Sequence, residues 1–171
     1  MTWITCAKPG ARLRQCHAFH HLPLPLRHGT LALCAVPAGT DARAALAAFA
    51  PSLVVSMTEP DEMENLGAGD LPDWLTAQGI LWRGFPIPDF GTPPPGADWA
   101  ALARDAARIL DAKGRVLLHC RGGLGRSGMI ALRLMIEAGE EPDAALKRLR
   151  LARPGAVETE AQEHWATAGQ C

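Results

Sequence analysis

A cysteine, three glycines, two arginines and a serine lie within one short stretch, from Cys120 to Ser127. A cysteine reacts as a thiolate, and the unpaired N–H groups and dipole at a helix N-terminus stabilise that negative charge. The same N–H groups bind a phosphate. Because an apolar strand precedes this stretch and a helical pattern follows it, we predict that Cys120 attacks the phosphorus atom of a phosphate held in the loop.

The residues after Cys120 suit a phosphate-binding loop. Glycines let successive backbone N–H groups point inward, toward the phosphoryl oxygens. The planar fork of Arg126 matches two of those oxygens, which a lysine could not reproduce. Ser127 can hydrogen-bond the cysteine sulfur and help it leave, and His119 is expected to support the loop from the strand end. The predicted phosphate-binding residues are Arg121, Gly122, Gly123, Leu124, Gly125 and Arg126.

An ester oxygen leaves more readily when a general acid protonates it. Asp89 is the candidate, because it follows a predicted strand in a proline-rich loop that could close over a bound substrate. The same carboxylate could then accept a proton from the hydrolytic water. The alternative is that Asp89 is a turn residue after Pro88.

These residues need a scaffold that brings the loop and the aspartate together. Hydrophobic patterning predicts strands over residues 31–36, 53–57, 80–85 and 115–119. Helices are predicted over residues 42–50, 61–66, 71–78, 99–113, 126–138, 142–151 and 158–168. Strands that alternate with helices indicate an α/β fold with a central, mostly parallel sheet flanked by helices. The helix over 126–138 is apolar nearly all round and is expected at the centre of the domain.

The composition limits the classes of partner. The chain has 171 residues, which fits a single domain over 1–171, although residues 1–30 give no clear assignment. Lys+Arg 17 against Asp+Glu 18 argues against nucleic acid or a membrane surface as a partner. No apolar run is long enough to span a bilayer. Five cysteines at scattered spacings predict reduced thiols, and hence a cytoplasmic protein.

The Cys-x5-Arg-Ser loop, preceded by His119 and by the aspartate loop, resembles the protein tyrosine and dual-specificity phosphatase superfamily. With residues 86–89 and 153–159, it is most similar to the kinase-associated phosphatase group of small dual-specificity enzymes. The resemblance spans residues 52–166. It implies phosphatase-like topology, a phosphocysteine intermediate on Cys120, phosphate binding by Arg126, acid catalysis by Asp89, and no cofactor or metal. It also matches Gln162 to a glutamine that helps to position water in some relatives.

The resemblance leaves the substrate open. Ile87 stands where tyrosine-specific enzymes carry a tryptophan, and the chain is too short for their substrate-recognition loop. A phosphorylated protein, carrying phosphotyrosine, phosphoserine or phosphothreonine, and a small phosphate monoester are all expected partners. The oligomeric state stays open.

Several of these residues also fit other interpretations. Residues 123–128 also match the GxGxxG dinucleotide-binding fingerprint, which requires a further strand ending in an acidic residue about twenty positions on. A Walker A loop lacks its lysine, and a sulfurtransferase would leave Arg126 and Asp89 without roles. A cysteine protease needs a histidine base that nothing marks. A phosphate-binding module with little turnover is the main alternative function. A metal cluster is conceivable from Cys16, His17, His20, His21 and His28, although their spacing matches no standard site.

Overall fold

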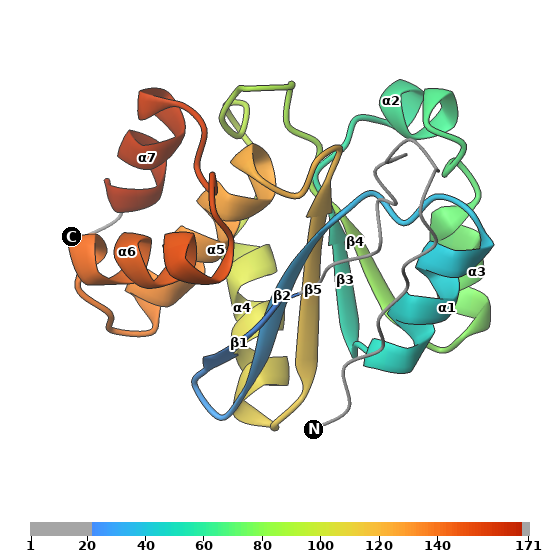
Figure 1. The fold of residues 1–171 in the computed structure, drawn as a ribbon, viewed down its shortest axis with the longest axis horizontal. Coiled ribbons are helices and arrows are strands. Elements are labelled where there is room, and N and C mark those ends of the chain that lie inside the picture. The colour runs from blue at the N-terminus through green and yellow to red at the C-terminus, as the bar shows by residue number, and fades with distance from the viewer. Residues whose placement is uncertain (1–21, 169–171) are drawn as a thin grey trace, which may run out of the picture.

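The structure is a computed structural model, and it describes residues 22–168 (Figure 1). The strands are β1 (Leu22–Leu26), β2 (Gly29–Ala35), β3 (Leu53–Ser56), β4 (Leu81–Gly84) and β5 (Arg115–Cys120). The helices are α1 (Thr40–Phe49), α2 (Pro60–Asn65), α3 (Leu71–Ala77), α4 (Trp99–Asp111), α5 (Gly125–Glu137), α6 (Pro142–Ala152) and α7 (Glu160–Thr167). The alternation of strands and helices confirms the predicted α/β class.

The strands form one sheet in the order β1-β2-β5-β3-β4. Every neighbouring pair is parallel except β1 and β2, so the predicted mostly parallel sheet is confirmed. β5 lies in the middle, and its residues from Val116 to Cys120 are buried. A strand covered by helices on both faces reads as a continuous apolar run, which is why this strand was recognisable. Cys120 is its last residue.

β1 is the strand that the sequence did not reveal. Its alternating leucines and prolines, Leu22-Pro23-Leu24-Pro25-Leu26, resemble no ordinary strand, because proline cannot donate a backbone hydrogen bond. The structure places this segment at the edge of the sheet, antiparallel to β2, where one side of the strand needs no partner. Leu24 and Leu26 are buried, so these two leucines face the core.

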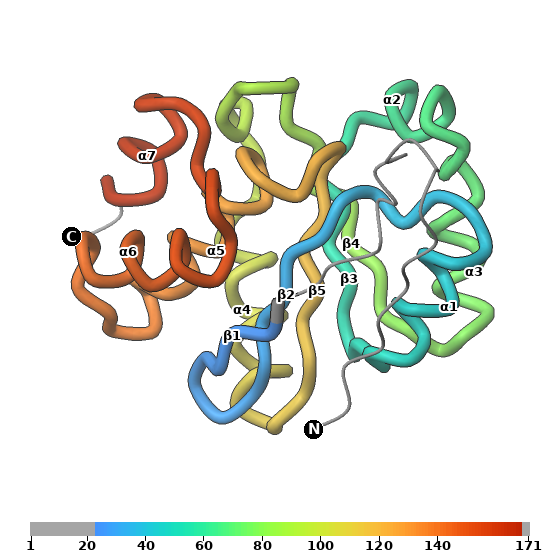
Figure 2. The backbone as a smooth tube through the Cα atoms, viewed as in Figure 1, coloured from blue at the N-terminus to red at the C-terminus, as the bar shows by residue number. Residues whose placement is uncertain are grey.

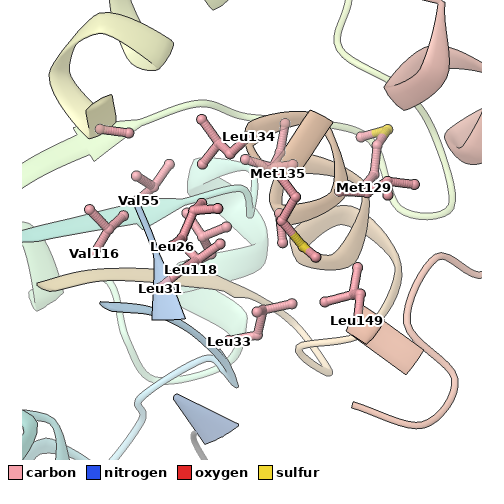
Figure 3. Close-up of a cluster of buried hydrophobic side chains, with 14 of the residues drawn as sticks. Leu26, Leu31, Leu33, Val55, Val116, Leu118, Met129, Leu134, Met135 and Leu149 are labelled. Atoms are coloured by element: carbon pink, nitrogen blue, oxygen red, sulfur yellow. The ribbon is translucent and has the colours of Figure 1, made fainter. Parts of the chain in front are cut away.

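Two hydrophobic cores sandwich the sheet. Helices α4 and α5 cover one face, and α1 and α3 cover the other (Figure 1). Figure 3 shows the first core, in which Leu31, Val55 and Leu118 of the strands lie opposite Leu134 and Met135 of α5. α5 is buried over almost its whole length, as its apolar sequence predicted, and α6 and α7 pack against its far side. No helix within residues 22–168 is long and apolar enough to cross a bilayer.

The parallel strands all end at one edge of the sheet, and four distant segments meet there. The β5–α5 loop, the segment between β4 and α4, helix α2 and the start of α7 lie at this same end of the molecule (Figure 2). In parallel α/β sheets, binding sites form outside the carboxyl ends of the strands. The topology therefore brings the predicted loop and the predicted acid together.

Candidate active site

Cys120 lies at the end of β5 with only 3% of its surface exposed. The backbone N–H of Gly123 donates to its Sγ over 3.2 Å, and Oγ of Ser127 lies 3.4 Å from the same sulfur. The loop then leads directly into α5, which begins at Gly125. One backbone N–H and one hydroxyl therefore lie beside the sulfur, and hydrogen-bond donors at a helix N-terminus are the groups that stabilise a thiolate.

The loop depends on glycine at position 123. Gly123 has a φ of 70°, a left-handed conformation that favours glycine. A Cβ there would also lie only 2.3 Å from the backbone carbon of Cys34 on β2. Both the turn and the close approach to the neighbouring strand therefore exclude a side chain.

Arg153 holds the outer side of this loop, a contact that was not predicted. It follows α6, and its Nε and Nη2 donate to the carbonyl oxygens of Gly123 and Gly122, each over 3.0 Å. In the sequence, Arg153 appeared only as the first residue of the 153–159 segment that carries part of the family resemblance. By binding these two carbonyls, its guanidinium fixes the orientation of the loop's peptide groups. The Arg-Pro-Gly triplet after a helix was the only available signal.

Arg126 is 1% exposed, and its charge is balanced by Glu62. Nη1 and Nη2 donate to the two carboxylate oxygens of Glu62 over 2.7 and 2.8 Å, and Nη1 also donates to the carbonyl of Ile87 over 3.0 Å. Burial opposes the charge of Arg126, but the hydrogen bonds and attraction of Glu62 prevail and raise its pKa. In return, hydrogen bonding to Arg126 lowers the pKa of Glu62. The sequence did not point to Glu62, because no local pattern distinguishes it from the other carboxylates of a short, mostly exposed helix.

Asp89 reaches the same guanidinium. Its Oδ1 lies 2.9 Å from Nη2 of Arg126 and also accepts the backbone N–H of Phe90 over 3.2 Å. Asp89 is the second residue of a turn closed by a 2.8 Å hydrogen bond from the N–H of Gly91 to the carbonyl of Pro88. Asp89 is therefore a turn residue that also lies beside Arg126, so its place in a turn does not exclude the predicted role as general acid.

His119 is fully buried beneath the loop. Its Nε2 lies 2.6 Å from Oγ of Ser56, which also accepts the indole N–H of Trp82 over 2.8 Å. The hydroxyl of Ser56 therefore bonds both the indole N–H of Trp82, which it accepts, and the ring of His119, where the direction of the bond is set by the imidazole tautomer. Burial lowers the pKa of His119 to about 4, so the ring is neutral near pH 7. This environment agrees with a supporting role and disfavours a titrating base.

Gln162, in the first turn of α7, is completely buried. Its Oε1 accepts the backbone N–H of Glu158 over 3.0 Å, and its Nε2 donates to the carbonyl of Gly91 over 3.2 Å. Gln162 thus contacts the aspartate-bearing turn directly. The water-positioning role suggested by the resemblance is untested.

The structure also bears on two of the alternative interpretations. A dinucleotide-binding unit requires a strand after α5, but helix α6 follows, so that interpretation is wrong. The proposed ligands Cys16, His17, His20 and His21 lie outside the described residues, while His28 is exposed between β1 and β2. Within residues 22–168, no group of three or more histidine, cysteine, aspartate or glutamate side chains is placed to hold a metal.

The fold and this loop are those of the dual-specificity and tyrosine phosphatase class. Residues 25–166 match the family model described as "Swiss Army Knife protein, DSP-PTPase phosphatase domain". The chain therefore belongs to this phosphatase family, and the resemblance found in the sequence is confirmed.

Individual relatives agree with this assignment. Cyclin-dependent kinase inhibitor 3 of Rattus norvegicus is 35% identical over 101 residues, which are 57% of this chain and 47% of that protein. Protein tyrosine phosphatase type IVA 3 of Homo sapiens is 36% identical over 87 residues, 48% of this chain and 49% of that protein. The matched part thus spans about half the length of these curated relatives.

Solved structures extend the likeness over most of the chain. A crystal structure of kinase associated phosphatase, with its catalytic site cysteine substituted by serine, has a TM-score of 0.78 at 24% identity. The match covers 90% of this chain and 98% of that one, and it supports the fold. The active form of Tk-PTP is 33% identical with a TM-score of 0.63, covering 78% of this chain and 86% of that one.

Proposed function

We propose that this protein is a phosphatase that hydrolyses phosphate monoesters through a phosphocysteine intermediate. The observation that carries the proposal is the convergence of Cys120, Arg126 and Asp89. The sulfur of Cys120 accepts the N–H of Gly123 over 3.2 Å, and the predicted acid lies 2.9 Å from the predicted phosphate ligand. These residues come from three segments, and their joint placement suits transfer of a phosphoryl group.

In the first step, the thiolate of Cys120 attacks phosphorus, so an S–P bond forms and the ester P–O bond breaks. The loop N–H groups and Arg126 bind the phosphoryl oxygens. Because Asp89 already contacts Nη2 of Arg126, the incoming phosphate competes with it for the guanidinium. Asp89, in its protonated form, donates its proton to the departing oxygen, which leaves as an alcohol or phenol.

In the second step, water attacks the phosphocysteine and Asp89, now a carboxylate, accepts a proton from it. The P–O bond to water forms as the S–P bond breaks, and inorganic phosphate is released. The sulfur leaves as a thiolate, and the hydroxyl of Ser127 and the N–H of Gly123 are placed to stabilise it. No metal or other cofactor takes part in this scheme.

The proposed substrates are phosphorylated proteins, carrying phosphotyrosine, phosphoserine or phosphothreonine, or small phosphate monoesters. A cytoplasmic setting would keep Cys120 reduced and therefore reactive. A module that only binds phosphate would need neither a thiolate nor an acid, so the presence of both favours turnover over binding alone.

The test is hydrolysis of p-nitrophenyl phosphate without metal and under reducing conditions, in wild type and in Cys120→Ser. We expect vanadate-sensitive activity in wild type alone. Activity that survives in Cys120→Ser would refute the mechanism. If neither protein turns over substrate but both bind phosphate, the phosphate-binding module becomes the better description.

A further inference from the structure

The turn that carries Asp89 needs to be held from outside. Phe90 has a φ of 57°, the left-handed region that a bulky residue rarely adopts, and the strain costs roughly 1 kcal/mol or more. Its side chain is 60% exposed, so packing of the ring contributes little to holding this conformation. The surrounding structure must therefore supply contacts that keep the turn in place.

The segment is held at both ends through backbone carbonyls. At its start, Nη1 of Arg126 donates to the carbonyl of Ile87 over 3.0 Å. At its end, Nε2 of Gln162 donates to the carbonyl of Gly91 over 3.2 Å. Asp89 lies between these two contacts. One contact comes from the phosphate ligand itself and the other comes from α7.

The amide of Gln162 is oriented by its surroundings. Its Oε1 accepts the N–H of Glu158, so the amide nitrogen must face the opposite way, toward Gly91. The helix turn that presents this side chain is capped by Thr159, whose Oγ1 accepts the N–H of Gln162 over 3.2 Å. A fully buried amide with both ends bound to backbone is rigid, which is what a fixed support requires.

We propose that Gln162 is a positioning residue for the general acid: it holds the Pro88–Gly91 turn so that Asp89 stays beside Arg126. This inference rests on the proposed function and assigns Gln162 a role in the first chemical step. A glutamine that positions water would act in the second step. The two roles are separable, because kcat/KM reports only events up to formation of the phosphocysteine.

The experiment compares Gln162→Glu and Gln162→Met with wild type. The glutamate keeps the shape and can still accept the N–H of Glu158, but when ionised it cannot donate to Gly91. The methionine keeps the length without hydrogen bonds. For a phosphoserine peptide, whose alkoxide leaves poorly, we expect kcat/KM to fall about tenfold in both variants. For p-nitrophenyl phosphate, whose leaving group needs little protonation, we expect less than about a twofold change.

Thr167→Ala is the matched control, because it removes a hydroxyl near the other end of α7 that donates to the carbonyls of Glu163 and His164 and does not contact Gln162. It should leave both kcat/KM values near wild type. In an Asp89→Asn background, Gln162→Glu should add no further loss, since the acid that it positions is already gone. A full additional tenfold loss in that background would overturn the proposal.

Two other results would also overturn it. One is an unchanged kcat/KM with a reduced kcat and a burst of p-nitrophenol, which indicates slow hydrolysis of the phosphocysteine. The other is an equal loss in Thr167→Ala, which indicates only a weakened α7. Hydrogen exchange gives a readout independent of turnover: the amides of residues 89–91 should exchange faster in Gln162→Glu and at the wild-type rate in Thr167→Ala. If wild type lacks activity, the proposed function fails, while this exchange still tests the contact between Gln162 and the turn.

Discussion

Oδ1 of Asp89 lies 2.9 Å from Nη2 of Arg126, so the predicted acid and the predicted phosphate ligand are paired with each other. A phosphate dianion that binds Arg126 must compete with this carboxylate for the same N–H groups. The carboxylate of Asp89 therefore weakens phosphate binding, although the same group is needed as the acid during turnover. Substitution of Asp89 should change the affinity for phosphate and the rate of turnover in opposite directions.

Asp89→Asn should strengthen anion binding while it slows turnover. Removing the competing charge should lower the inhibition constant of inorganic phosphate by up to about fivefold, the scale of a partly exposed ion pair. Loss of the acid should reduce kcat/KM for a phosphoserine peptide by about a hundredfold or more. The control is Asp61→Asn, which removes the same charge from an exposed position on α2. Equal effects in the two variants would mean that net charge, and not the pairing with Arg126, is responsible.

Glu62→Gln should destabilise the fold because it removes the carboxylate that makes two hydrogen bonds to the buried Arg126 and leaves only the more exposed Asp89 as a charged partner. The expected loss in the free energy of unfolding is about 3 kcal/mol at pH 7, measured by urea denaturation. The pKa of Glu62 is lowered by Arg126, so its contribution is present above its ordinary pKa and is lost as pH falls through the folded value. The difference between wild type and Glu62→Gln should therefore shrink on acidification. Glu64→Gln, on the exposed side of α2, is the control and should show little change.

His119 should make stability depend on pH between about 6.5 and 4. Burial lowers its pKa from 6.5 to about 4, so in this range the unfolded chain binds a proton that the folded protein does not. Stability should then rise with pH across the window, by about 3 kcal/mol in total. In His119→Asn this part of the dependence should disappear, whereas the exposed His164→Asn should keep it. An identical pH profile in wild type and His119→Asn would show that His119 is not the titrating group.

Arg153→Lys should weaken phosphate binding without a large loss of stability. A lysine presents one ammonium group and cannot bind the carbonyls of Gly122 and Gly123 with the geometry of the guanidinium fork. We expect kcat/KM to fall about tenfold, the scale of one or two lost charge-assisted hydrogen bonds. Arg148→Lys alters an arginine of α6, the helix that Arg153 follows; Arg148 contacts Glu140 and Pro25, and this variant should keep wild-type kinetics. Comparable kinetic losses in both variants would point to a general effect on α6.

The sequence by itself determined the parts of this protein whose signals are local. The strand, loop and helix around Cys120 were predictable because a continuous apolar run, a glycine cluster and an apolar helix follow one another directly in the chain. The α/β alternation was readable for the same reason. β1 was not predictable from its own residues, because its prolines are tolerated only at the edge of a sheet. Which strand lies at an edge depends on the whole topology and not on local sequence.

Only the tertiary structure decided which partners complete the site. Glu62 from α2, Arg153 from the end of α6 and Gln162 from α7 all contact the loop or the acid turn, yet each is far from its partner in sequence. A buried charge or amide must be paired, but local patterning does not say by which residue. That choice follows from the parallel sheet, which brings the ends of distant segments to one edge and lets packing select among their side chains.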